Sequence, residues 1–181
     1  FKPKLFLGMT ATPDKRDDGD ASRNVYELFH YQIAYEIRLQ QAMEEDLLCP
    51  FHYFGISDIS MITDEQTKAR NVSEEYFGRL TSDERVRHVI EQARYYGYSG
   101  DRVKGLIFCS RNRECEELSA KFNRLGYRTV ALSGKNTDRE REAAFERLAM
   151  NEADTTDEMQ PLDYIFSVDI LNEGVDIVEV N

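Results

Sequence analysis

Three short apolar runs, separated from one another by helical patterns, constrain the fold of this chain more than any other feature. They cover residues 103–110 (VKGLIFCS), 127–132 (YRTVAL) and 163–168 (DYIFSV). A continuous apolar run is typical of a strand that is covered on both faces. Strands that alternate with helices form right-handed βαβ units and a mainly parallel sheet. The segment 81–168 therefore predicts a doubly wound α/β domain.

Helical periodicity precedes the first of these runs and fills the gaps between them. Thr81 with Glu84, and Thr137 with Glu140, have the spacing of capping boxes and predict a helix start at each place. Gly126 follows the middle helical pattern, as expected of the glycine after a helix C-terminus. The expected apolar faces consist of Val86, Val89, Ile90 and Ala93, then Cys115, Leu118, Phe122 and Leu125, and then Phe145, Leu148 and Ala149.

The first half of the chain has a less regular pattern. Residues 4–9 predict a short buried strand, 35–37 a brief strand and 51–59 an aromatic-rich strand. Residues 39–47 have helical spacing, and Pro50 is expected to close that helix. The stretches expected to be loops, because they are polar or aperiodic, are 14–20, 60–78 and 151–160.

The charge of the chain limits its partners. It has 23 basic and 34 acidic residues, a net charge of −11, which excludes a general nucleic-acid coating protein of the usual basic kind. Any contact with nucleic acid must therefore be local. No stretch approaches the roughly 20 apolar residues of a membrane span, so no membrane partner is expected.

The cysteines and histidines give no sign of a metal site. Cys49, Cys109 and Cys115 have no CxxC spacing, which indicates neither a zinc knuckle nor a redox motif. Cys49 and Cys109 lie in apolar runs and are expected to be buried thiols, which suits a reducing, cytoplasmic location. The three histidines are widely spaced, and no metal ligands are predicted.

Small polar and basic residues follow the predicted strands. In doubly wound sheets, ligands gather at the carboxyl ends of the strands. This geometry places Ser110 and Arg111, Ser133 and Gly134, and the segment after Val168 on one functional edge.

Four segments, in order along the chain, resemble motifs of superfamily 2 helicases. Residues 10–13 (TATP) are similar to motif III and residues 106–111 (LIFCSR) to motif IV. Residues 131–134 (ALSG) occupy the place of a short turn that contacts the nucleic-acid backbone. Residues 167–176 (SVDILNEGVD) resemble motif V with its Gly-x-Asp signature.

The resemblance implies a RecA-like second motor lobe that is incomplete at its C-terminal end. The implied organisation is residues 1–13 as the end of a first lobe, 14–50 as a connector and 51–181 as the second lobe. The tract 34–56 (AYEIRLQQAMEEDLLCPFHYFGI) and the wording NEGVDI resemble the restriction-enzyme-like DEAD/DEAH group, which includes type III restriction subunits.

The resemblance also implies roles for individual residues. Thr10 and Thr12 would couple the state of ATP to strand separation; a strand cap is the structural alternative. The residues implied to contact the phosphate backbone are Ser110, Arg111, Ser133 and Gly134. Hydroxyl and guanidinium groups suit phosphate without reading sequence. For Arg111 and Ser133, helix capping is an equally open interpretation.

Gly174 and Asp176 are the implied ATP-binding pair, with Asp176 reaching the ribose; a turn glycine with a surface aspartate is the alternative. Two departures from the family are Val168 before Asp169, where Thr-Asp is common, and Glu173 in place of a frequent arginine. The first puts a hydroxyl contact in doubt, and the second weakens the analogy to RNA helicases.

The expected function is that of part of an ATP-dependent helicase or translocase, acting on DNA rather than RNA together with a first motor lobe. ATP and Mg²⁺ are expected cofactors of the intact protein, with none bound to this fragment. A P-loop, an Asp-Glu box and motif VI are absent from the sequence, so the fragment alone is expected to be inactive as an ATPase. The alternative is a non-catalytic α/β module, nucleic-acid-binding or structural, of a restriction or repair complex.

Overall fold

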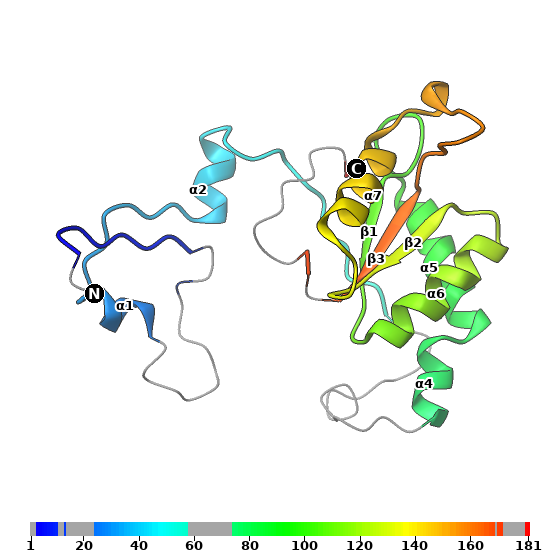
Figure 1. Ribbon diagram of the computed structural model, residues 1–181, viewed down its shortest axis with the longest axis horizontal. Coiled ribbons are helices and arrows are strands. Elements are labelled where there is room, and N and C mark those ends of the chain that lie inside the picture. The colour runs from blue at the N-terminus through cyan, green and yellow to red at the C-terminus, as the bar shows by residue number, and fades with distance from the viewer. Residues whose placement is uncertain (1–2, 11–12, 14–23, 58–73, 169, 172–179) are drawn as a thin grey trace. The chain divides into compact units, whose positions relative to one another are not determined.

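The computed structural model describes residues 3–10, 13, 24–57, 74–168, 170–171 and 180–181. The chain divides into two compact units, Phe1–Gly55 and Ile56–Asn181, which are coloured blue to cyan and cyan to red in Figure 1. Within the described residues, no helix has the length and apolar character needed to cross a membrane.

The described residues of the first unit form two short helices and bury little surface. Helix α1 (Val25–Leu28) begins after Asn24, whose side-chain oxygen accepts a hydrogen bond from the Tyr26 N–H at 3.0 Å. Helix α2 (Leu39–Glu44) confirms the expected helix but ends well before Pro50. Among the described residues of this unit, Ala42 is the one in the buried class.

The strands predicted for the first half of the chain do not form in the described residues. Residues 4–9 are extended chain without a sheet partner, and the side chains of Leu5 and Leu7 are 85% and 70% exposed. Residues 35–37 and 51–57 likewise contain no strand. Local pattern can favour an extended backbone, but a strand also needs a neighbour to accept and donate its hydrogen bonds.

The second unit contains a three-stranded parallel sheet, which confirms the predicted α/β class. Strands β1 (Gly105–Phe108), β2 (Thr129–Leu132) and β3 (Tyr164–Ser167) lie in the order β1-β3-β2. Both neighbours run parallel to β3, and Tyr164 is level with both Gly105 and Thr129. The apolar runs predicted these strands correctly, although each is shorter than its run.

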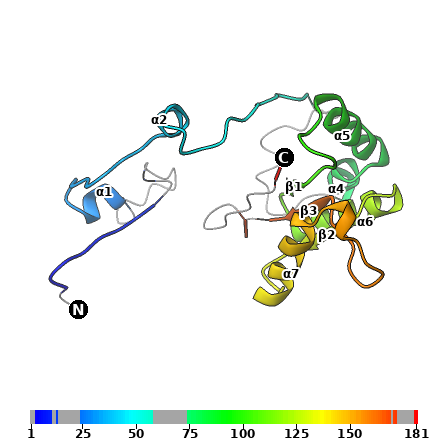
Figure 2. The same cartoon turned by 90° about the horizontal axis from the view of Figure 1, so that it is seen from above.

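Helices cover both faces of this sheet (Figures 1 and 2). Helices α5 (Asp83–Tyr96) and α6 (Asn112–Arg124) pack on the face to which Phe166 points. Helix α7 (Asp138–Ala149) packs on the opposite face, against Ile165. Because β3 sends consecutive side chains into two separate cores, the sheet is doubly wound.

The described part of the second unit also contains two short helical segments outside this layered core. Helix α4 (Glu74–Leu80) precedes α5, so the loop predicted for residues 60–78 is wrong over residues 74–78; residues 60–73 lie outside the described part. Tyr76, Phe77 and Leu80 bury the inner side of α4. A turn of 3₁₀ helix (Glu152–Asp154) interrupts the loop expected at residues 151–160.

The helix ends follow the predicted chemistry, with one correction. Thr137 and Glu140 form the predicted capping box of α7, and Gly126 has the left-handed φ of 92° expected just after α6. The capping box predicted for Thr81 is wrong, because the buried Thr81 hydroxyl instead donates to the Phe77 carbonyl at 3.1 Å. Ser82 caps α5 in its place, accepting from the Arg85 N–H at 3.2 Å.

A buried arginine joins the elements at the amino edge of the sheet. The guanidinium of Arg102, which is 8% exposed, donates to the carbonyls of Leu148 and Leu162, each at 2.6 Å, and to that of Met150. These carbonyls belong to the C-terminus of α7 and to the residue two before β3. Asp163 lies 3.6 Å from Arg102 and neutralises its charge.

A second arginine, Arg128 just before β2, also binds the carboxylate of Asp163. Arg128 donates to Asp163 Oδ1 at 2.8 Å and makes two hydrogen bonds to Glu152, at 2.8 and 2.9 Å. These hydrogen bonds, first to Glu152 and then to Asp163, raise the pKa of Arg128. The network fixes the chain before β2 against the chain before β3.

Replacing Arg102 with alanine leaves several buried carbonyls and the Asp163 carboxylate without this partner. We expect the free energy of unfolding to fall by about 3 kcal/mol or more, the usual effect of removing one partner of a buried charged network. Urea unfolding followed by circular dichroism measures the loss. The exposed Arg87→Ala on α5 is the matched control and should change stability by less than about 0.5 kcal/mol. Equal stability of the two variants would contradict the assigned role.

Candidate functional site

The three strands end at the same level, and the predicted site residues follow them directly. Phe108 and Leu132 are both in register with Ser167. Because β3 lies between the other two strands, the ends of β1 and β2 are about 9.5 Å apart, which is two strand spacings. Ser110 and Arg111 thus flank the centre of the carboxyl edge on one side, and Ser133 flanks it on the other.

On the β1 side, Ser110 is bound to a glutamate that sequence reasoning missed. Glu114 Oε2 accepts hydrogen bonds from the Ser110 N–H at 2.9 Å and from the Ser110 hydroxyl at 2.8 Å. Arg111 in turn donates from Nη1 to the Ser110 hydroxyl oxygen at 3.2 Å. The hydroxyl proton of Ser110 is therefore already engaged by Glu114.

Glu114 is buried although it lies in the first turn of α6. It is 4% exposed, and carboxylates are buried at this level only when they are paired. Arg85 of α5 lies 3.6 Å from Glu114 Oε1 and also donates to the Leu80 carbonyl at 2.7 Å. The sequence does contain a signal for this contact: Glu114 comes four positions after Ser110, which is close to the three-residue spacing of a capping box.

Arg113, the next basic residue along α6, holds α4. Its guanidinium lies over the Phe77 ring at 4.0 Å from the centroid. It also makes two hydrogen bonds to Glu74, at 2.8 and 3.2 Å. The hydrogen bond from Arg113 lowers the pKa of the Glu74 carboxyl. Arg113 therefore links α6 to α4 through ring packing and an ion pair.

On the β2 side, residues 133–136 form a closed turn. Asn136 Oδ1 accepts from the Ser133 N–H at 2.8 Å, while the Asn136 N–H donates to the Ser133 carbonyl at 3.1 Å. The Lys135 N–H donates to the Ser133 hydroxyl at 3.3 Å. Gly134 is exposed at the tip, with open space where a side chain would stand.

The side chains of Arg111 and Ser133 do not cap the helices that follow them. Arg111 occupies the N-cap position of α6 but makes no side-chain capping hydrogen bond. Helix α7 is capped by Thr137, four residues after Ser133. Both helices begin at the carboxyl edge, so their positive dipole ends lie beside the site.

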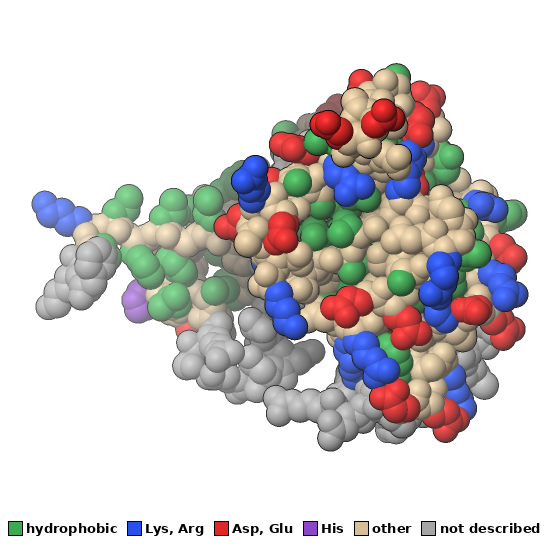
Figure 3. All heavy atoms as spheres, turned by 45° about the vertical axis from the view of Figure 1, so that its right-hand side comes forward, with side chains coloured by type: hydrophobic (Ala, Val, Ile, Leu, Met, Phe, Trp, Pro, Cys, Tyr) green, Lys and Arg blue, Asp and Glu red, His purple; other side chains and the backbone are tan. Residues whose placement is uncertain are grey.

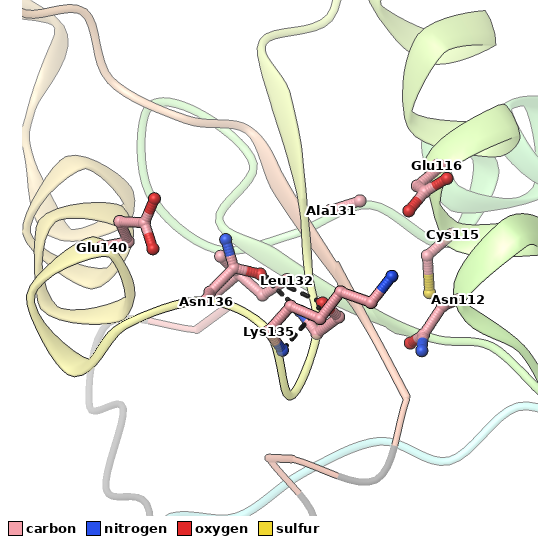
Figure 4. Close-up of a pocket in the computed structure, with 9 residues that line it drawn as sticks. Asn112, Cys115, Glu116, Ala131, Leu132, Lys135, Asn136 and Glu140 are labelled. Carbon is pink, nitrogen blue, oxygen red and sulfur yellow. Dashed lines mark hydrogen bonds between the residues drawn. The ribbon is translucent and has the colours of Figure 1, made fainter.

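A shallow hollow of about 230 Å³ lies between α6 and this turn. Figure 4 shows the Lys135 side chain extending from the turn toward the α6 side, where Asn112 and Glu116 lie. The remaining lining residues are Cys115, Ala131, Leu132, Ser133, Asn136 and Glu140. The charged residues that line the hollow are Lys135, Glu116 and Glu140, so its lining contains both positive and negative side chains.

Two cysteines lie close together near the start of α6, and one of them, Cys115, lines the hollow. Cys115 is buried and Cys109, half-buried, packs against the same apolar cluster. Their mutual hydrogen bond raises the pKa of Cys109 and lowers the pKa of Cys115. The expectation of a buried Cys49 is wrong, because that thiol is exposed in the first unit.

Ser167 is the central polar residue of the carboxyl edge. Its side chain is fully buried, and its hydroxyl has no hydrogen-bond partner among the described residues. It stands between Phe108 and Leu132 in the sheet register. A buried hydroxyl without a partner is unusual, since such groups are nearly always satisfied.

The other predicted site residues belong to the first unit or lie outside the described residues. Thr10 is exposed in the first unit, while Thr12, Gly174 and Asp176 lie outside the described residues, as does Asp169. The part of the chain that the structure describes contains no group of three or more His, Cys, Asp or Glu side chains arranged for a metal ion.

Comparison with protein families gives the decisive observation. The family model described as helicase conserved C-terminal domain matches residues 84–181, which is more than half of the chain. The chain belongs to this family. The matched region contains the whole sheet with α6 and α7, so this unit is a RecA-like second lobe of a nucleic-acid helicase. No curated protein matches the chain.

The helicase C-terminal domain shows mixed charge on its surface. On the face seen in Figure 3, basic and acidic side chains are interspersed over the second unit. This face therefore presents no broad basic field to a polyanion.

Asn136→Ala tests the turn on the β2 side. The substitution removes the acceptor for the Ser133 N–H, and we expect a stability loss of about 1 kcal/mol together with faster amide exchange at Ser133 and Lys135. Hydrogen–deuterium exchange measures this directly. Lys135→Ala is the control, because it keeps every backbone donor of the turn and should leave exchange unchanged. Unchanged protection in Asn136→Ala would contradict the assigned hydrogen bond.

Proposed function

We propose that this helicase lobe binds the phosphate backbone of DNA at the carboxyl edge of its sheet, as one half of an ATP-dependent motor. Arg111 is the principal contact, assisted by the turn at residues 133–136. The observation that supports this most is the position of Arg111. Arg111 is the N-cap residue of α6 and follows β1 closely, so its positive charge lies at the carboxyl edge of the sheet.

The geometry of the edge favours an anion. Helices α6 and α7 both begin there, and unsatisfied N–H groups at helix N-termini attract phosphate. The open space above Gly134 permits close approach to the backbone of the turn. These features recognise phosphate without reading bases, which suits a motor that steps along any sequence.

The ATP-dependent part of the proposal concerns the intact protein. Gly174 and Asp176 are the proposed ATP-binding residues, and ATP with Mg²⁺ supplies the energy of each step when bound between this lobe and a companion first lobe. Thr10 and Thr12 are the proposed coupling residues. The restriction-enzyme-like resemblance of the tract 34–56 supports DNA as the substrate rather than RNA.

Arg111→Gln should weaken binding of a fluorescently labelled single-stranded DNA about tenfold, as expected for the loss of one charge-assisted contact. The slope of log affinity against log salt should fall by about 0.7, the contribution of one phosphate contact on a single strand. Fluorescence anisotropy across a salt series measures both. Arg124→Gln, at the opposite end of α6, is the control and should keep the wild-type slope. Wild-type affinity and slope in Arg111→Gln would refute the proposed contact.

The ATP contact is tested in the full-length protein. Asp176→Ala should raise the KM for ATP by about tenfold, because a hydrogen bond from the ribose to a carboxylate is lost. DNA-stimulated ATP turnover gives the measurement. Asp154→Ala, an exposed aspartate of the 3₁₀ turn, is the control. Unchanged kinetics in Asp176→Ala would remove Asp176 from the ATP site without affecting the phosphate contact of Arg111.

A further inference from the structure

Two cysteines meet where β1 passes into α6. Cys109 directly follows β1, and its N–H donates to the Ser167 carbonyl at 2.9 Å, which continues the pairing of the strand. Because side chains alternate along a strand, Cys109 points to the same face as Ile107, into the apolar cluster under α5 and α6. Cys115, near the start of α6, is 1% exposed in that same cluster. One thiol therefore enters the cluster from the strand and the other from the helix.

The two thiols are in contact, and they are not equivalent. The hydrogen bond from the Cys109 thiol lowers the pKa of Cys115, whereas the same hydrogen bond, together with burial, raises the pKa of Cys109. The thiolate is the reactive form of a cysteine, so Cys115 is the attacking sulfur of the pair. Cys115 also lines the hollow beside α6 (Figure 4), and this hollow is the route to its sulfur from solvent.

The spacing of the pair is not that of a CxxC motif. Five residues, 110–114, separate Cys109 from Cys115, and they form the loop after β1 and the first residues of α6. The short loop and the packing of α6 on the sheet bring the two sulfurs together. A bond between them closes a small ring that contains Ser110 and Arg111.

We propose that Cys109 and Cys115 form a reversible dithiol–disulfide pair, a modification site whose oxidant is hydrogen peroxide or another small hydroperoxide. In a reducing compartment such pairs are usually transient and redox-sensing, so the dithiol is the resting form. The inference goes beyond the proposed function, and it does not depend on which groups contact phosphate.

The oxidation proceeds in two steps. The Cys115 thiolate attacks one oxygen of hydrogen peroxide, the O–O bond breaks, and a sulfenic acid forms as hydroxide leaves. The Cys109 sulfur then attacks the Cys115 sulfur; the S–S bond forms, and the sulfenic oxygen leaves as water with the Cys109 proton. The hydroxide takes up the proton that Cys115 had lost. Two thiols are thus oxidised to one disulfide, and one peroxide is reduced to two waters.

Peptide mapping tests the site directly. The chain with Cys49→Ser, which removes the exposed thiol of the first unit, is treated with hydrogen peroxide and digested with trypsin without reduction. Cleavage after Arg111 and Arg113 places the two cysteines in separate peptides, 105–111 and 114–121. We expect these peptides to be joined in the main oxidised product and to separate after treatment with dithiothreitol. Oxidation that leaves them unjoined would overturn the proposal.

The matched controls are Cys109→Ser and Cys115→Ser, each added to the Cys49→Ser chain. Neither can form the joined peptides. Because Cys115 is the attacking thiol, the chain that retains it should still form a sulfenic acid with peroxide, whereas the chain that retains only Cys109 should react at least about tenfold more slowly. Dimedone labelling measures the sulfenic acid. Equal labelling of the two variants would remove Cys115 as the attacking sulfur.

The unfolded chain shows whether the fold, rather than the short spacing, makes the pair. In glutathione buffers, the equilibrium constant for the disulfide should be about tenfold or more larger in the folded protein than in urea, because a bond that fits the fold mainly restricts the unfolded chain. Amide exchange of the oxidised protein should slow over residues 110–114 and stay unchanged over 133–136. A constant that is no larger in the folded protein would refute the proposed pair and leave the phosphate contact of Arg111 untouched.

Discussion

The hydrogen bonding of β3 to both of its neighbours is the constraint on which the second unit depends. Tyr164–Ser167 lies in the middle of the sheet and sends Ile165 into one core and Phe166 into the other. Its register brings Phe108 and Leu132 level with Ser167, so the loops that follow β1 and β2 emerge side by side. At the opposite edge Arg102 ties α7 to the start of this strand. The Arg102 network and the proposed binding site therefore lie at opposite ends of the same strands.

Sequence pattern predicted the second unit well, because its elements are defined by short-range features. The apolar runs, the Thr137 capping box and the glycine after α6 are all recognisable within a few residues. The strand predictions failed in the first unit, where the extended chain at residues 4–9 has no described partner strand. The sequence also predicts the wrong capping residue for α5, Thr81 instead of Ser82, because a cap depends on non-local contacts too. The identity of the capping residue depends on whether the Phe77 carbonyl, at the end of another helix, is available to its hydroxyl.

The candidate site shows the same limit. The position of Ser110, Arg111 and Ser133 follows from the rule that loops after parallel strands share one edge. The burial of Glu114 does not, because it depends on Arg85 of a separate helix reaching across to balance it. Arg113 is a second example: in the sequence it is one more basic residue, but in the structure it packs on Phe77 and pairs with Glu74 of α4. The interactions at this edge thus depend on contacts from neighbouring helices, and that information is not local.

The strand order also has a consequence for how the chain acquires its structure. β1 and β2 are synthesised first, yet they do not pair with each other, because both pair with β3. Tyr164, at the start of β3, comes 35 residues after its partner Thr129 in β2 and 59 residues after its partner Gly105 in β1. A nascent chain that has released only α5, β1, α6 and β2 has two unpaired strands and an incomplete core. Sheet formation must wait until residues 164–167 leave the ribosome, and such non-local closure is slow. During that interval, the exposed strands are the part of the nascent chain most open to aggregation or to binding by a chaperone.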